Sequence, residues 1–435
     1  MLHDPGSRQS LHTSGDIEIT AEDRQVLRSL GETLSEIASD PIHREKALLW
    51  TKVNDRQSSR PVVYINELPW HELNVDDELT LQCTGTWAMD LEQRLRREIY
   101  QWRHMPADMV VSPFFVCPLS IKSTSFGISE DVDIARTDDA SGVYSRHFNR
   151  QIKEPEDLEK IKMPTVTYDE AQSAQSYAAM VDLFADLMPI KKVGQSHIWF
   201  TPWDFLIRWW GIQEAMIDLV MRPEMVHDGV ERMVGSWMTE LDQFEEHNLL
   251  SLDCRNIRVG SGGYGYTNDL PGDDYDPEHV KPKNMWGCSN AQIFSEVSPE
   301  MHWEFAVEHD LKWLERWGMT YYGCCEPLDK KIDVMRRIPN LRKISVSPWN
   351  DIQKVVDSVG DDYVLSVKPS PAIFASDHLD ADRARTEIAA MLDVTNGKSH
   401  VELIMKDVST VKYNPQQLWE WARIAMETVQ EYRGP

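Results

Sequence analysis

The stretch SPEMHWEFAVEHDLKWLERWGMTYYGCCEP, residues 298–327, contains one helix signal followed directly by one strand signal. Ser298 and Pro299 supply a capping side chain and a preset φ, an apolar stripe recurs at helical spacing, and Gly318 follows the last turn. The apolar and aromatic run 319–324 then predicts a strand. A helix that leads into a strand is half of the repeating unit of parallel α/β proteins.

The same unit recurs along the chain. A second helix signal begins at Asn414 and Pro415, and Gly260–Tyr266 is not a dinucleotide-binding turn because it opens no helix and has the wrong glycine spacing. We therefore predict a (β/α)8 TIM barrel rather than an open doubly wound sheet. The eight expected strands are 61–66, 109–115, 192–200, 249–259, 319–324, 342–346, 363–367 and 400–405.

The barrel accounts for most of the chain. Residues 1–20 are polar and predict a flexible N-terminal lead-in, and 21–435 predict a single barrel domain. The segments 71–107, 122–190 and 260–297 are too long for simple connections, so we expect long insertions around the rim.

Composition limits the partners. The 71 acidic and 45 basic residues give a formal net charge of −26, which disfavours binding to nucleic acid or to an anionic membrane. The longest uncharged stretch, 109–121, is too short to span a bilayer, and the N-terminus has no secretion signal. Six cysteines in 435 residues do not make a disulfide framework. We expect a cytoplasmic protein.

The most specific candidate site follows the strand 319–324, because barrel enzymes work at the carboxyl ends of their strands. Strict alternation places Tyr322, Cys324 and Glu326 on one side and Cys325 on the other. Thiolates and a carboxylate suit zinc, so we predict these two cysteines and Glu326 as metal ligands. The alternative is that both cysteines are small hydrophobic residues at a tight strand exit.

Charged residues mark two further strand exits. Lys406 and Asp407 follow the apolar run 400–405, and neither is needed for the core, so we predict Lys406 as catalytic and Asp407 as a metal ligand. Glu67 precedes Leu-Pro-Trp in a partly apolar setting that could raise its pKa enough for proton transfer, and we predict it as catalytic. The alternatives are that Lys406 and Asp407 are an ordinary solvated loop pair and that Glu67 is the N-cap of the next helix.

Aromatic and amide side chains complete the predicted site. Tyr264, Tyr266 and Asn268 lie in a glycine-rich loop, where the backbone can approach a ligand closely. Trp70 follows Glu67 at the first strand exit, and Tyr322 precedes the two cysteines. We predict these five residues as substrate-binding.

Two longer stretches suggest a family. HIWFTPWDFLIRWWGIQEAMIDLVMRPEMVHDGVERM (197–233) and NAQIFSEVSPEMHWEFAVEHDLKWL (290–314) resemble the uroporphyrinogen decarboxylase superfamily, which includes corrinoid-dependent methyltransferases. The decarboxylases carry an arginine-rich segment after strand one and a Ser-Asp pair at the next strand exit. This chain has neither, and Ser112-Pro113 stands in place of the second, so porphyrinogen decarboxylation is disfavoured.

The methyltransferase branch is similar in having His-x-Cys at one strand exit and a second Cys at a later one, all bound to zinc. Here Tyr322-Gly323-Cys324 aligns with the first element and Lys406-Asp407 with the second. Cys324 is therefore the one position that keeps the residue type of the family's ligand. Some demethylase-like members use carboxylates as zinc ligands, so the resemblance allows Glu326 and Asp407 to replace the missing ligands.

The resemblance implies a zinc-dependent methyltransferase or demethylase that moves a methyl group from a small O-, N- or S-methylated compound to a corrinoid on a separate protein. Related barrels often pair, which suggests a homodimer. The alternatives are a cofactor-free decarboxylase or lyase, with Lys406 and Arg258 holding a carboxylate, and a small-molecule binding barrel without catalysis. Glycoside hydrolysis is disfavoured because no convincing acid pair shares one strand exit.

Overall fold

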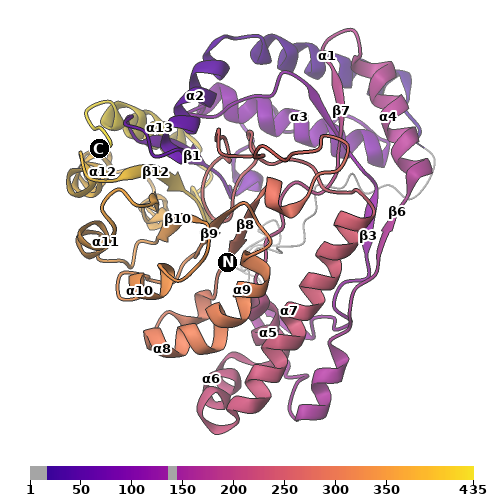
Figure 1. Cartoon of the computed structure of the whole chain (residues 1–435). Coiled ribbons are helices and arrows are strands. Elements are labelled where there is room, and N and C mark those ends of the chain that lie inside the picture. The colour runs from indigo at the N-terminus through magenta and orange to yellow at the C-terminus, as the bar shows by residue number, and fades with distance from the viewer. Residues whose placement is uncertain (1–16, 136–144) are drawn as a thin grey trace.

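The computed structural model describes residues 17–135 and 145–435 (Figure 1). Most of the predicted lead-in 1–20, up to residue 16, lies outside the described residues. Helix α1 (Ala21–Ala38) is capped by Thr20, whose side chain accepts a hydrogen bond from the Asp23 amide. Within the described ranges, we find no helix with the length and apolar character that a membrane crossing requires.

A parallel sheet of six strands lies at the centre of the molecule (Figure 1). The strand order is β1-β12-β11-β10-β9-β8, so from β8 onward each strand adds beside the previous one and the last pairs with β1. The mixed α/β class with a parallel sheet is therefore confirmed. The strands are β1 (Val62–Ile65), β8 (Trp286–Ser289), β9 (Met319–Tyr322), β10 (Leu341–Val346), β11 (Val364–Val367) and β12 (His400–Met405).

Five predicted strands correspond to members of this sheet, namely those at 61–66, 319–324, 342–346, 363–367 and 400–405. The strand β8 was placed wrongly in the rim insertion 260–297, because its sequence Trp-Gly-Cys-Ser has little β propensity. The other three predicted strands are mostly not strands. Their nearest regular elements are β2 (Phe115–Pro118), β7 (Ile190–Val193) and an isolated bridge between Gln195 and Leu250.

Between β1 and β8 the described chain does not form the continuous eight-strand ladder that a closed barrel predicts. Buried aspartates take the place of ladder bonds there. The Asp108 carboxylate accepts a hydrogen bond from the Val63 amide, and the Asp253 carboxylate accepts one from the Trp286 amide. Side chains can tie irregular segments to a sheet in this way, but they leave no strand register.

Helices cover one face of the sheet (Figure 1). Tyr322 and Val346 on that face pack with buried residues such as Trp313 and Trp421. The predicted helix after Ser298 is confirmed, although a π-helical turn interrupts it. The helices after β8 are α8 (Pro299–His302), the π-helix Trp303–Val307, α9 (Glu308–Leu314), α10 (Ile332–Met335), α11 (Ile352–Val359), α12 (Ala381–Thr395) and α13 (Gln416–Val429).

The opposite face of the sheet is filled by the glycine loop 260–265 and by Trp50. A Cβ at Gly262 would come within 2.2 Å of the Glu402 carboxylate, and one at Gly263 within 2.3 Å of the Trp50 ring. Only glycine therefore lets the loop lie this close to the sheet. The wholly buried Lys343–Glu402 ion pair lies beneath it, with Nζ to Oε2 at 2.8 Å.

The remaining elements form an N-terminal helical layer and the predicted rim segments. Helices α1, α3 and α4 share an apolar cluster of buried residues that includes Leu27, Leu91 and Phe184. The elements are α2 (Ile42–Asn54), α3 (Thr86–His104), α4 (Glu170–Phe184), α5 (Pro202–Trp210), α6 (Ile212–Met221), α7 (Pro223–Glu246), β3 (Ile121–Ser123), β4 (Val132–Ala135), β5 (Ser145–Phe148), β6 (Val166–Tyr168) and short 3-10 turns at Trp70–Glu72, Pro155–Lys160, Pro282–Asn284, Gln292–Phe294 and Pro371–Ala375.

Candidate functional site

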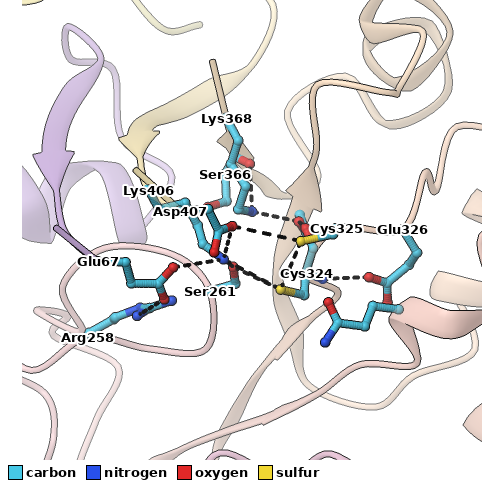
Figure 2. A network of polar contacts seen from close by, with 12 residues as sticks. Glu67, Arg258, Ser261, Cys324, Cys325, Glu326, Ser366, Lys368, Lys406 and Asp407 are labelled. Atoms are coloured by element: carbon cyan, nitrogen blue, oxygen red, sulfur yellow. Dashed lines mark hydrogen bonds and ion pairs between the residues drawn. The ribbon is translucent and has the colours of Figure 1, made fainter. Parts of the chain in front are cut away.

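Charged and thiol side chains from separate parts of the chain meet at the carboxyl end of the sheet (Figure 2). Glu67 follows β1, Cys324 follows β9 and Lys406 follows β12. Ser261 reaches the same place from the glycine loop. Because the carboxyl ends of parallel strands share one edge, four residues far apart in sequence become neighbours.

Cys324 lies at the centre of this cluster and is only 5% exposed. Its Sγ is 3.6 Å from the Lys406 Nζ and 3.6 Å from the Ser261 Oγ. The Cys325 Sγ is also 3.6 Å away. The hydrogen bond from the Cys325 thiol and the charges of Lys406 and Lys368 outweigh burial and hold the pKa of Cys324 well below that of an ordinary thiol. These contacts therefore favour the thiolate form of Cys324.

Cys325 has the opposite character. The neighbouring Cys324 thiolate and burial raise its pKa, so Cys325 stays a thiol and donates to Cys324. Its Sγ also lies 3.9 Å from the Asp407 Oδ2. The adjacent cysteines thus form a thiolate and thiol pair, in which one sulfur carries the charge and the other the proton.

Lys406 connects the thiolate to two carboxylates. Its Nζ is 3.0 Å from the Asp407 Oδ2 and 3.4 Å from the Glu67 Oε2. Burial alone would lower the pKa of Lys406, but Cys324, Glu67 and Asp407 together raise it well above its usual value. The Arg258 guanidinium pairs with the far side of Glu67, with Nη1 to Oε1 at 2.5 Å. Lys406 is therefore a permanent cation held between anions.

The backbone around this cation is strained. Glu67 has φ +52° and Asp407 has φ +56°, in the left-handed region that non-glycine residues seldom adopt. Such residues concentrate at functional sites, where the surrounding structure offsets the strain. The two carboxylates that flank Lys406 are thus placed at a conformational cost.

A second lysine, Lys368, follows β11 and lies close to the same thiolate. Its Nζ donates to the Ser345 Oγ at 2.6 Å and to the Tyr321 hydroxyl at 2.9 Å. Burial, together with the charge of Lys406, lowers the pKa of Lys368 to about 8. Lys368 is consequently able to give up a proton near neutral pH.

The predicted alternation after β9 is wrong for Tyr322. Gly323 has φ +100°, which breaks the strand pleat, so Tyr322 and Cys324 do not share a side. Tyr322 is wholly buried on the helix-covered face, where its hydroxyl bonds to His302 at 2.7 Å. The structure therefore removes Tyr322 from the predicted substrate-binding set.

Glu326 does not face the sulfur atoms. Its Oε2 accepts from the Cys324 amide at 2.8 Å and its Oε1 from the Ala291 amide at 3.1 Å. Figure 2 shows this carboxylate on the backbone side of Cys324. Burial and the Cys324 thiolate raise the pKa of Glu326 to about 7. Glu326 ties the exits of β8 and β9 together and is a positioning residue rather than the predicted metal ligand.

The zinc set predicted from the sequence does not fit this geometry. Within the described ranges, no group of three or more His, Cys, Asp and Glu side chains could hold a metal ion. The Lys406 ammonium already supplies positive charge next to Cys324 and Asp407. Zinc is therefore left as a prediction of the resemblance, and no step is assigned to it.

The glycine-loop residues predicted to bind substrate contact Trp50, Asn54 and Asp55. The Tyr264 ring packs against Trp50 on the face of the sheet that the glycine loop covers. The Tyr264 and Tyr266 carbonyls accept hydrogen bonds from the Asn54 side chain. The Asn268 side chain donates to Asp55, at the end of α2. These contacts assign the three loop residues a packing role.

Trp70 also lies outside the cluster of Cys324 and Lys406. Its ring stacks edge-on against Tyr100 of α3, at 6.1 Å between centroids, and the Arg97 guanidinium lies over it. These are contacts with the helical layer, so the structure does not bring Trp70 to the thiolate.

Sequence reasoning missed several residues of the site. Lys368 directly follows the apolar run 364–367, as Lys406 follows its own strand, so the same signal could have found it. Ser261 carried no signal beyond its glycine neighbours. Asp204 and Asn290 are buried beside this region, and each has a side-chain atom with no hydrogen-bond partner among the residues that the structure describes. Burial and the Cys324 thiolate raise the pKa of Asp204 to about 6.

Comparisons with known proteins add little to this geometry. No family model matches the chain, and no curated protein matches it. Among solved structures, the chain is similar to a methyltransferase from Methanosarcina mazei, with 9% sequence identity and a TM-score of 0.49. The match covers 89% of this chain and 98% of the other. A likeness at this level assigns no activity.

Proposed function

We propose that this protein is a methyltransferase in which the Cys324 thiolate accepts a methyl group from a small O-, N- or S-methylated compound. The observation that carries the proposal is the Cys324 Sγ lying 3.6 Å from the Lys406 Nζ at the carboxyl end of the sheet. A thiolate beside a cation is the form of cysteine that attacks carbon. The resemblance of residues 197–233 and 290–314 supplies methyl as the transferred group.

The transfer is an in-line displacement. A bond forms between the Cys324 Sγ and the methyl carbon, and the bond from that carbon to the donor heteroatom breaks with its electron pair. The negative charge thereby moves from sulfur to the leaving heteroatom. Lys406 stays next to this charge as it moves and remains a cation, so it stabilises the transition state without rearranging. The leaving atom takes its proton from water.

Neighbouring groups fix Lys406 for this task. Glu67 and Asp407 hold its ammonium on two sides, and Ser261 accepts from it at 3.0 Å. Arg258 neutralises the far side of Glu67. These contacts support the predicted role of Lys406 in catalysis, with Glu67 and Asp407 as positioning residues.

The acceptor in the second half of the cycle is a reduced corrinoid on a separate protein, as the resemblance implies. Displacement by that acceptor would release the thiolate and return Cys324 to its starting state. Partner identity and the homodimer belong to this proposal and rest on the resemblance, and the step described here uses no zinc.

The decarboxylase alternative is less well supported by the contacts. It requires Lys406 and Arg258 to hold a substrate carboxylate, yet both already pair with Glu67. A second carboxylate would have to displace a buried ion pair, which is costly. A binding protein without catalysis would not need a thiolate held next to a lysine.

Turnover with free cob(I)alamin as the acceptor tests the proposal. A panel of small methyl ethers, methylamines and methyl thioethers is offered, and methylcobalamin formation is followed by its absorbance. We expect one class of donor to react with the wild type and the Cys324→Ser variant to be inactive. The Cys254→Ser variant is the matched control and should keep full activity. Turnover by the Cys324→Ser variant would count against the proposal. A wild type that turns over none of the donors would count against it as well.

A further inference from the structure

Cys324 and Cys325 are free cysteines with their sulfur atoms in contact, 3.6 Å apart. Their surroundings differ, because the Lys406 Nζ and the Ser261 Oγ lie 3.6 Å from the Cys324 sulfur, whereas the Cys325 sulfur lies 3.9 Å from the Asp407 Oδ2. Cys325 is partly exposed, whereas Cys324 is buried behind it. The pair thus combines a charged sulfur, a neutral sulfur at contact distance and access from solvent.

We propose that Cys324 and Cys325 form a reversible oxidation site for peroxides. This goes beyond methyl transfer and does not depend on it. The features required of such a site are a thiolate, access to solvent and an adjacent thiol that traps the first product. Cys324 supplies the sulfur beside the Lys406 cation, and Cys325 supplies the adjacent thiol and the approach from solvent.

The reaction takes two steps. The Cys324 thiolate attacks one oxygen of hydrogen peroxide, the O–O bond breaks, and the products are a sulfenic acid and hydroxide. The Cys325 sulfur then attacks the sulfenic sulfur, the S–O bond breaks, and water leaves with the Cys325 proton. The sulfurs lose two electrons in total, and the peroxide gains them. The product is a disulfide between neighbouring residues.

Geometry makes this product easy to reduce. Neighbouring Cα atoms are about 3.8 Å apart, whereas unstrained disulfides join Cα atoms about 4.4 to 6.8 Å apart. A disulfide between Cys324 and Cys325 is therefore strained, and strain favours reduction. Gly323 on one side gives the backbone the freedom to adopt the closed form. Oxidation at this site protects Cys324 from further oxidation and switches it off until a thiol reduces it.

Peptide mass spectrometry of the full chain after treatment with hydrogen peroxide tests the proposal. Trypsin cleaves after Arg316 and Lys330 and releases one peptide, 317–330, that contains both cysteines. We expect this peptide to lose two hydrogen atoms and to regain them with dithiothreitol. A wild-type peptide that keeps two free thiols, or that gains oxygen irreversibly, overturns the proposal, and this result needs no variant to fold.

Two variants separate the roles of the sulfurs. In Cys325→Ser, no resolving thiol remains, so excess peroxide should carry Cys324 past the sulfenic acid to the sulfinic acid, and the peptide should gain two oxygen atoms that dithiothreitol does not remove. In Cys324→Ser, we expect oxidation at pH 7 to slow by about 30-fold, the ratio of a full thiolate to an ordinary thiol. Cys254→Ser should behave as the wild type. Full recovery of Cys325→Ser, or wild-type rates in Cys324→Ser, contradicts the assignment.

Discussion

Replacing Lys406 with methionine should displace the pH profile of Cys324 alkylation towards higher pH. The Lys406 Nζ is 3.6 Å from the Cys324 Sγ. At that distance and an effective dielectric constant of about 20, two unit charges attract by roughly 4 to 5 kcal/mol. In the variant, water that enters near Cys324 solvates the thiolate and replaces part of this attraction. On the acid side of the profile we therefore expect the alkylation rate at a fixed pH to fall by about a hundredfold to a thousandfold.

Iodoacetamide labelling, read from the peptide 317–330 at a series of pH values, measures this profile. Lys406→Arg keeps the charge and should keep most of the wild-type profile. Lys398→Met is a matched control, because Lys398 is exposed and precedes β12 while Lys406 follows it. Superimposable profiles for the wild type and Lys406→Met would refute the reasoning, since Lys406 would then not hold the thiolate.

Three further predictions concern stability and metal. Burial raises the pKa of Asp310 to about 7, so the folded state binds the proton of this carboxyl more tightly than the unfolded state does. The free energy of unfolding should therefore fall by up to about 4 kcal/mol as pH rises from about 4 to 7. Urea denaturation at a series of pH values should show this fall, and the Asp310→Asn variant should show less of it. Gly263→Ala drives a methyl group into Trp50 and should destabilise the protein by about 2 to 3 kcal/mol. Gly235→Ala lies inside α7, where a Cβ would make only an ordinary contact with Met163 at 3.9 Å, so it should stabilise the protein by about 0.5 to 1 kcal/mol. Equal thermal shifts for the two variants would contradict the loop packing. Because Lys406 already supplies the positive charge, activity should survive dialysis against a chelator, and loss of activity that zinc restores would return the site to metal chemistry.

Part of the candidate site could be predicted from the sequence, because its residues follow apolar runs. Cys324, Lys406 and Glu67 each stand just beyond a strand, and parallel strands bring their carboxyl ends together. That rule needs no knowledge of loops. Five strands of the sheet were predictable because each carries several β-branched, aromatic or other apolar residues within four to six positions.

The rest depended on local geometry or on contacts between distant segments. A positive φ at Gly323 turned Tyr322 away from Cys324, and no pattern of residue types announces such a break. Glu326 looked like a ligand, but two backbone amides from neighbouring strands hold it. Ser261 contacts Lys406 because the glycine loop lies against the sheet, and this packing joins segments that are far apart in the sequence. Glu326 has a residue type that zinc binds, but its carboxylate points to these amides and not to the sulfur atoms.

The mass of the peptide 317–330 after reaction with a deuterated methyl donor tests the central claim most directly. A donor identified with cob(I)alamin is offered without acceptor, and the peptide is analysed before and after the acceptor is added. We predict one labelled methyl group on Cys324 that disappears on addition of the acceptor. An unlabelled peptide during turnover, or turnover retained in Cys324→Ser, would contradict the account.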